Sequence, residues 1–228
     1  MRAREPDADG YVDRGGVKLH RARAADAVLD ATGTDRAVLV SLSMGAMWAL
    51  WLMANRPERV LGSVFIGASV PLGPGYDDRQ QPFEEPYTST EGWARYNRHY
   101  WLDHDRDFLG FFFSRCFTEP HSTKPVADSV GWGLETSPEV LIAESHAPWP
   151  EEATLRGWGA AGRCPVLVVH GDDDRISPLR RGAALAEASG GALVVLEGAG
   201  HIPLARDPVK VNLLLREFVE GLPARSGP

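Results

Sequence analysis

The chain has 228 residues, of which 43% are hydrophobic, and it contains 24 Gly and 17 Pro. This composition is typical of one globular domain and excludes a fibrous or disordered protein. The formal net charge is −7, which argues against a general affinity for nucleic acid or for anionic membranes, so neither is an expected partner. The two cysteines, Cys116 and Cys164, form no CxxC pair. Because this pattern supports neither a disulfide framework nor a structural zinc, we expect a cytoplasmic protein.

The first part of the chain predicts strands that alternate with helices. A hairpin is expected over Tyr11 to His20, followed by a helix over Ala22 to Ala31. A buried strand over Ala37 to Leu42, a helix from Met44 to about Asn55 and a second apolar strand over Leu61 to Gly67 come next. The order strand, helix, strand predicts a parallel βαβ unit.

The uncharged run from Ala37 to Asn55 is long enough to raise the alternative of a membrane-spanning helix. Its first part is rich in Val and Leu, and Ser41, Ser43 and Gly45 interrupt its middle. Because strand-forming residues precede helix-forming ones, the pattern favours a strand and a separate helix.

The middle of the chain, from Val70 to about Pro150, differs from the first part in its residue composition. Prolines break its first part into loop, and aromatic residues then crowd two expected short helices. We therefore expect an inserted helical lid, with residues 1–70 and 161–228 forming a core and residues 71–160 forming the lid. Large aromatic side chains can line a substrate pocket or merely pack the lid, and both interpretations stay open for Trp101 and Phe112. The aromatic residues of this part are Trp93, Tyr96, Tyr100, Trp101, Phe108, Phe111, Phe112, Phe113 and Phe117.

After Pro165 the sequence again predicts strands that alternate with helices. Strands are predicted over Val166 to His170 and over Ala192 to Leu196, and helices over Leu179 to Ser189 and over Pro208 to Leu222. The two halves together predict a mostly parallel α/β sheet.

Ser43 follows the first buried strand and precedes a helix of small residues. A nucleophile elbow needs small residues two positions to either side of the nucleophile, and Ser41 and Gly45 meet that demand. The helix that follows would direct the Met44 amide at a developing oxyanion. The alternative interpretation is that Ser43 only caps this helix.

Two further segments place polar residues after predicted strands. Asp174 follows the strand that ends at His170, and His201 follows the strand that ends at Leu196. Polar groups at the carboxyl ends of parallel strands meet at one edge of the sheet. The chain order Ser43, Asp174, His201 is the Ser, acid, His order of a catalytic triad built on such a sheet.

These residues resemble the α/β-hydrolase superfamily, in its branch with a serine nucleophile and a cap. The resemblance covers residues 26–69 and 163–219, including Cys164-Pro165, His170-Gly171 with Asp174 three positions beyond the glycine, and Gly198-Ala199-Gly200-His201. It implies a reduced, mostly parallel α/β-hydrolase sheet with a helical cap insertion. It also implies a small-molecule ester-like substrate, cleaved with Ser43 as nucleophile, Asp174 as acid and His201 as base, with no cofactor.

Other functions stay open at this point. The chain could be a non-catalytic remnant that keeps triad residues, or a C–C bond hydrolase or a cofactor-free perhydrolase on the same scaffold. Cation binding by Asp172 to Asp174 is the weaker interpretation, since a hydrated turn with one buried acid explains these residues. A metal site is likewise the weaker interpretation of the helical positions His99, Asp103, His104 and Asp107, so no metal is expected.

The chain departs from the family pattern between His20 and Ala24. Complete members place a strand, a glycine-rich loop, a helix and another strand after such a hairpin, and that loop supplies an amide to the oxyanion hole. Without this segment, Met44 would be the remaining expected donor. The strand Ala37 to Leu42 would lie at an open edge or at one re-paired by the hairpin Tyr11 to His20, and both alternatives stay open. Because exposed apolar edges recruit other chains, we expect self-association through an open edge.

Overall fold

The computed structural model of the chain describes residues 21–79, 82–146 and 148–223, so the expected hairpin at Tyr11 to His20 lies outside the described residues. A single sheet with the strand order β1-β2-β3-β4 forms the centre of the molecule, and all three neighbouring pairs are parallel. The strands are β1 (Ala37–Leu42), β2 (Val60–Ile66), β3 (Val166–Gly171) and β4 (Ala192–Leu196). The predicted reduced, parallel α/β sheet is confirmed.

The register of the sheet brings the carboxyl ends of all four strands to one edge. Leu42 pairs with Ile66, Ile66 pairs with Val169, and Gly171 pairs with Leu196. The segments that leave these strands, among them the turn at Ser43, therefore begin side by side, as the parallel topology requires.

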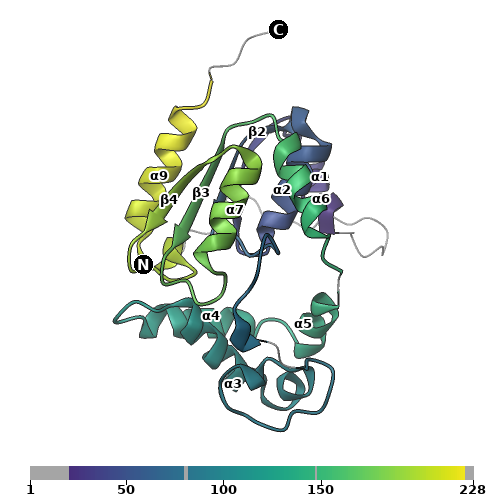
Figure 1. Cartoon of the computed structure of the whole chain (residues 1–228), viewed down its shortest axis with the longest axis vertical. Coiled ribbons are helices and arrows are strands. Elements are labelled where there is room, and N and C mark those ends of the chain that lie inside the picture. Colours follow the sequence, from purple (N-terminus) through teal and green to yellow (C-terminus); the bar gives the residue numbers. More distant parts are fainter. Residues whose placement is uncertain (1–20, 80–81, 147, 224–228) are drawn as a thin grey trace.

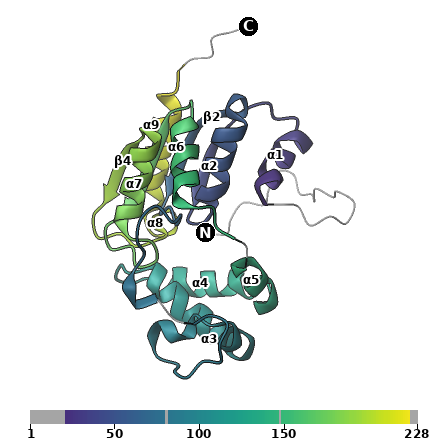
Figure 2. The ribbon, with the colours of Figure 1, turned by 45° about the vertical axis from the view of Figure 1, so that its right-hand side comes forward.

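Helices cover both faces of the sheet. In Figures 1 and 2, α9 lies on one face, and α2, α6 and α7 lie on the other. The described helices of the chain are α1 (Arg21–Ala31), α2 (Gly45–Asn55), α3 (Arg98–Cys116), α4 (Thr123–Gly133), α5 (Pro138–Ser145), α6 (Glu152–Ala161), α7 (Leu179–Ser189), α8 (Pro203–Arg206) and α9 (Pro208–Glu220). Short 3-10 turns occur at Pro57–Arg59, Asp77–Arg79 and Gly92–Arg95.

Alternate residues of the strands feed two hydrophobic cores. Phe65 of β2 packs with Leu50 of α2, Leu155 of α6 and Leu185 of α7 in one core. Val64, its neighbour in sequence, packs with Val211 of α9 in the core on the opposite face. This division follows from the pleat, which directs successive side chains to opposite faces of a strand.

The uncharged run from Ala37 to Asn55 divides into β1 and α2. Helix α2 is buried along Ala46, Leu50 and Met53, which contribute to the first core. Among the described residues, no helix combines the length and apolar character that crossing a membrane requires.

The segment from α3 to α5 gathers at the end of the sheet where the strands finish, as both ribbon views show. Helix α3 is interrupted at His104, where φ is −143° and ψ is 44°, so it consists of two helical stretches, in agreement with the two short helices that the sequence predicts. Three other helices, α4, α6 and the short α8, were not predicted. Glycines at positions 131, 157 and 159 weaken the helical pattern of α4 and α6, and Gly159 of α6 is in close contact with Ala188 next to the end of α7.

Strand β1 is the edge of the sheet among the described residues. It pairs with β2 along its whole length, and no described strand pairs with its other side. Val40 in the middle of β1 is 53% exposed, whereas six of the seven residues of β2 are buried. An apolar strand with unpaired backbone groups is a template for association with another chain.

We therefore expect Val40→Lys to reduce self-association of the protein. The wild-type chain should sediment faster as its concentration rises, whereas the Lys variant should stay closer to the monomer, since an edge charge opposes strand pairing. Val209→Lys is the matched control, because Val209 is 69% exposed but lies on α9. A wild-type sedimentation coefficient that is independent of concentration, or an equal effect of the control, would contradict this expectation.

Candidate active site

Ser43 occupies a strained turn between β1 and α2. Its φ angle is 53°, in the left-handed region that non-glycine residues rarely adopt. The turn is held by backbone hydrogen bonds, since the Ser43 amide donates to the Ile66 carbonyl over 3.0 Å and the Ser69 amide donates to the Ser43 carbonyl over 3.1 Å. Such a conformation costs about 1–3 kcal/mol and is characteristic of functional sites. It is the geometry of a nucleophile elbow.

Hydrogen bonds join Ser43, His201 and Asp174 into a chain. Ser43 Oγ lies 2.8 Å from His201 Nε2, and His201 Nδ1 lies 2.8 Å from Asp174 Oδ2. An ionised carboxylate only accepts hydrogen bonds, so Nδ1–H of His201 donates to Asp174. Nε2 is then the acceptor for the hydroxyl of Ser43. The structure thus brings together the three residues that the sequence order suggested.

Asp174 is held by four N–H groups. Its Oδ1 accepts from the amides of Ile176 and Ser177 over 2.8 and 2.9 Å, and its Oδ2 faces His201 over 2.8 Å and His170 over 3.2 Å. Burial alone would raise the pKa of this carboxyl group. The hydrogen bonds from His170 and His201 outweigh burial and hold the pKa of Asp174 well below its usual range. Asp174 is therefore ionised at neutral pH.

The loop that carries His201 is fixed by neighbouring backbone. The His201 amide donates to the carbonyl of Cys116 at the end of α3 over 2.8 Å, and the Gly200 amide donates to Glu119 Oε1 over 2.9 Å. Gly67 has a φ angle of 52°, and a Cβ atom at this position would lie 2.7 Å from the His201 carbonyl oxygen. Glycine is therefore required for β2 and the histidine loop to approach each other.

The Met44 amide is available to a ligand. Met44 is the N-cap of α2, and its N–H has no acceptor among the described residues. The N-terminal end of a helix carries partial positive charge, which favours an anion at this position. Ser43 is not the N-cap, and no side chain caps α2. The interpretation of Ser43 as a mere helix cap is therefore wrong.

An aromatic pocket of ≈ 450 Å³ adjoins the elbow through Met44. Both residues suggested for substrate contact, Trp101 and Phe112, line it. The other lining residues are Phe83, Tyr96, Phe108, Leu109, Phe113, Gly133, Leu141, Glu144, Ser145 and Trp149. The pocket is thus a largely apolar cavity that includes the residue after Ser43, and it has the size of a small-molecule site.

Comparison with protein families gives a match over residues 17–208 to the family described as alpha/beta hydrolase fold. The chain belongs to this family. No curated protein matches the sequence of this alpha/beta hydrolase.

Solved structures share its fold. An N-acyl homoserine lactone degrading enzyme is 24% identical, with a TM-score of 0.67 over 86% of this chain and 73% of that one. A Rhodococcus esterase is 23% identical, with a TM-score of 0.68 over 89% of this chain and 72% of that one. A bromoperoxidase from Bacillus anthracis is 19% identical, with a TM-score of 0.70 over 87% of this chain and 72% of that one.

In this alpha/beta hydrolase, the loop after β3 that carries Asp174, here called the acid loop, holds two other carboxylates, Asp172 and Asp173. Each of them has a separate partner. Asp172 accepts from the Gly198 amide over 2.7 Å, and Asp173 pairs with Arg175 over 3.1 Å. These carboxylates therefore do not converge with Asp174 on one point. Within the described residues, no group of three His, Cys, Asp or Glu side chains is arranged to hold a metal ion.

Two of the four positions at helical spacing in α3 also have partners of their own. His99 Nε2 lies 3.1 Å from the Glu84 carbonyl oxygen, and Asp107 accepts from the Tyr100 hydroxyl over 2.6 Å.

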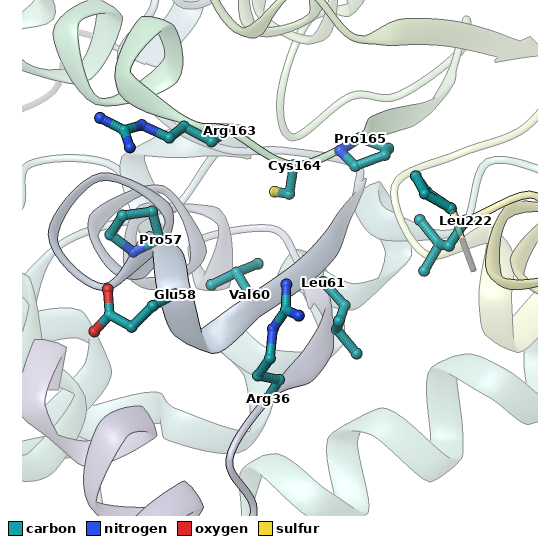
Figure 3. Close-up of a pocket in the computed structure, with 10 residues that line it drawn as sticks. Arg36, Pro57, Glu58, Val60, Leu61, Arg163, Cys164, Pro165 and Leu222 are labelled. Carbon is teal, nitrogen blue, oxygen red and sulfur yellow. The ribbon is translucent and has the colours of Figure 1, made fainter. Parts of the chain in front are cut away.

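A second cavity, of ≈ 550 Å³, lies at the opposite end of the sheet (Figure 3). Arg36 precedes β1 and Cys164 precedes β3, so this cavity lies at the amino ends of the strands, away from Ser43. Burial raises the pKa of the Cys164 thiol above its ordinary value. The thiol is therefore protonated at neutral pH, and this cavity forms no part of the candidate active site.

Proposed function

We propose that the protein hydrolyses small carboxylic esters with Ser43 as nucleophile, His201 as general base and acid, and Asp174 as the residue that orients His201. The observation that carries this proposal is the pair of 2.8 Å contacts from Ser43 to His201 and from His201 to Asp174. This arrangement is that of a serine hydrolase triad. In this proposal Ser43 attacks the substrate, His201 transfers the proton, and Asp174 orients His201. The Met44 amide stabilises the negative charge that develops.

In the first half of the reaction, Ser43 Oγ attacks the carbonyl carbon of the ester while its proton moves to His201 Nε2. The π electrons of the carbonyl bond move to its oxygen, and the Met44 N–H donates a hydrogen bond to the resulting oxyanion. His201 then transfers its proton to the alkoxide oxygen as the ester C–O bond breaks. The alcohol leaves, and the acyl group stays bound to Ser43.

In the second half, His201 removes a proton from water, and the water oxygen attacks the acyl carbon. Collapse of the second tetrahedral intermediate breaks the bond to Ser43 Oγ, which regains a proton from His201. The carboxylic acid leaves and the free enzyme is restored. These steps consume only ester and water, so the proposed reaction needs no cofactor.

The aromatic pocket favours a substrate with an apolar acyl or alcohol group. Its lining is dominated by aromatic side chains, and Met44 places one wall of it directly beside the oxyanion donor. A carbonyl group at Ser43 would therefore lie at the mouth of this pocket, with the apolar part of the substrate inside it. One similar structure is described as an esterase, which fits cleavage of an acyl C–O bond, and another as an enzyme that degrades N-acyl homoserine lactone, which fits an acylated substrate.

We expect Trp101→Ala and Phe112→Ala to change the ratio of turnover on butanoate and octanoate p-nitrophenyl esters. Removing either aromatic ring enlarges the pocket, so turnover of the octanoate ester should increase relative to turnover of the butanoate ester. Trp132→Ala is the matched control, because Trp132 is 63% exposed and does not line this pocket. Unchanged ratios in both pocket variants would mean that these aromatic residues only pack the structure.

Release of p-nitrophenol by the purified chain tests the proposal as a whole. Hydrolysis should saturate with substrate, require no added metal or cofactor, and disappear in Ser43→Ala. Absence of turnover across acetate, butanoate and octanoate esters would contradict the proposal and favour a non-catalytic role. If the protein is supplied with hydrogen peroxide and acetate, acetic acid and peroxide could condense to peracetic acid and water, and the peracid would oxidise bromide. Bromide oxidation under these conditions, in the absence of ester turnover, would instead favour perhydrolase chemistry.

A further inference from the structure

His170 is a buried histidine that contacts the acid of the triad. It belongs to β3, is fully buried, and has no part in the proton transfers between Ser43 and His201. Its Nε2 lies 2.9 Å from the Ser177 carbonyl oxygen and 3.2 Å from Asp174 Oδ2. The carboxylate of Asp174 thus lies between two imidazole rings.

The partners of His170 decide which ring nitrogen carries the proton. The Ser177 carbonyl oxygen can only accept a hydrogen bond, so Nε2 of His170 is the donor. The same nitrogen also lies 3.2 Å from Asp174 Oδ2, so this N–H has two acceptor oxygens close to it. The other nitrogen, Nδ1, has no hydrogen-bond partner in the described part of the chain.

Gly182 of α7 leaves room for the ring of His170. A Cβ atom at position 182 would lie 2.5 Å from His170 Nδ1. Glycine therefore lets α7 approach β3 closely enough to fix the ring from behind, and the ring can direct only Nε2 towards the acid loop. The position of His170 is set by helix packing on one side and by hydrogen bonds on the other.

The contact with Ser177 extends this arrangement to the whole acid loop. The Ser177 amide donates to Asp174 Oδ1 over 2.9 Å, and the Ser177 hydroxyl donates to the Ala68 carbonyl over 2.7 Å. His170 therefore holds the same turn that holds Asp174, and it also contacts the oxygen that faces His201. Loss of its N–H would leave Oδ2 with one donor and would release the Ser177 carbonyl.

We propose that His170 is a positioning residue that fixes the Asp174 carboxylate towards His201. This inference rests on the proposed function, because it assigns His170 a role in the triad that acts through Asp174. His170 does not touch the substrate or Ser43, so its loss should change kcat and leave KM nearly unchanged. A misplacement of catalytic groups by about 1 Å can cost about 100-fold in rate.

The test compares His170→Leu with His170→Gln. Leu removes the donor, whereas the amide of Gln can present an N–H near the position of Nε2. We expect kcat to fall by about 10- to 100-fold in His170→Leu, with KM within twofold of the wild-type value, and to recover in large part in His170→Gln. Equal kcat values for wild type and His170→Leu would overturn the proposal.

Gly182→Ala keeps the imidazole of His170 and its N–H donor, but the added methyl group would collide with Nδ1 and displace the ring. It provides a second variant should His170→Leu fail to fold, and it is expected to lower kcat with KM unchanged. Gly157→Ala is the matched control, because a Cβ atom at position 157 meets no atom within 4 Å. A Gly182→Ala variant with unchanged kcat would contradict the proposed role of the ring.

Proton NMR of the resting protein separates this proposal from the proposed function. The proton on His201 Nδ1, hydrogen-bonded to a buried carboxylate, should resonate far downfield in wild type and in His170→Gln. It should move upfield or be lost by exchange in His170→Leu, even in folded protein. An unchanged resonance in His170→Leu and Gly182→Ala overturns the positioning role, whereas absent ester turnover in wild type overturns the proposed function.

Discussion

Ser43→Ala and His201→Ala are each expected to lower kcat on a p-nitrophenyl ester by about 10⁶-fold, and Asp174→Asn by about 10⁴-fold. Ser43 supplies the attacking oxygen, and His201 accepts its proton over a 2.8 Å contact, so removal of either ends nucleophilic catalysis. Asn at position 174 keeps the size of the side chain but cannot stabilise the imidazolium of His201. Its effect should therefore be large but smaller than that of the other two.

The double variant Ser43→Ala with His201→Ala provides the internal control for this prediction. Groups that act as one unit give non-additive losses, so the double variant should be no slower than Ser43→Ala alone. The Michaelis constants should change little, because none of these residues lines the aromatic pocket. Full activity in any one of the single variants would remove that residue from the proposed mechanism.

Met44→Pro is expected to lower kcat by about 10²- to 10³-fold, which is the cost of losing one oxyanion donor. Proline removes the amide proton of residue 44, and the φ angle of −62° at Met44 is within the range that the proline ring allows. The described chain passes from α1 directly to β1, and the family resemblance places a second donor in a segment that the sequence lacks. The Met44 amide should therefore be the main source of oxyanion stabilisation.

Met44→Ala is the matched control for the proline variant, because it shortens the same side chain and keeps the N–H group. Its kcat on the acetate ester should stay within a few-fold of the wild-type value. In the same assay, we expect the wild-type chain to be slower than the similar Rhodococcus esterase by about the cost of one donor. Equal rates for these two enzymes, together with a small effect of Met44→Pro, would show that another amide completes the oxyanion hole.

The parts of the fold that local sequence determines were predicted well. Ala37–Leu42, Leu179–Ser189 and Ala192–Leu196 have the predicted bounds, because apolar runs and turn residues mark their ends. Helix α6 was missed because its burial depends on α2 and α7, which pack against Leu155 and Gly159. Contacts of this kind involve residues distant in sequence, and no local pattern encodes them.

The candidate site was predictable for a different reason. In a parallel sheet, the chain order of strand ends fixes which polar residues can meet, so Ser43, Asp174 and His201 could be grouped without a structure. The second contact to Asp174, from His170, could not be derived in this way. His170 belongs to a buried strand, and its ring direction depends on Gly182 and on Ser177.

Labelling of the purified protein with a serine-reactive fluorophosphonate, followed by location of the adduct by peptide mass, tests the central claim most directly. The proposed mechanism predicts one adduct, on Ser43, whose formation is lost in His201→Ala and slowed in Asp174→Asn. Ser41 serves as an internal control, because it is two positions away but hydrogen-bonds to the Val64 carbonyl instead of a histidine. A wild-type protein that gains no adduct, or one labelled equally in His201→Ala, would contradict the assignment of an activated serine at the elbow.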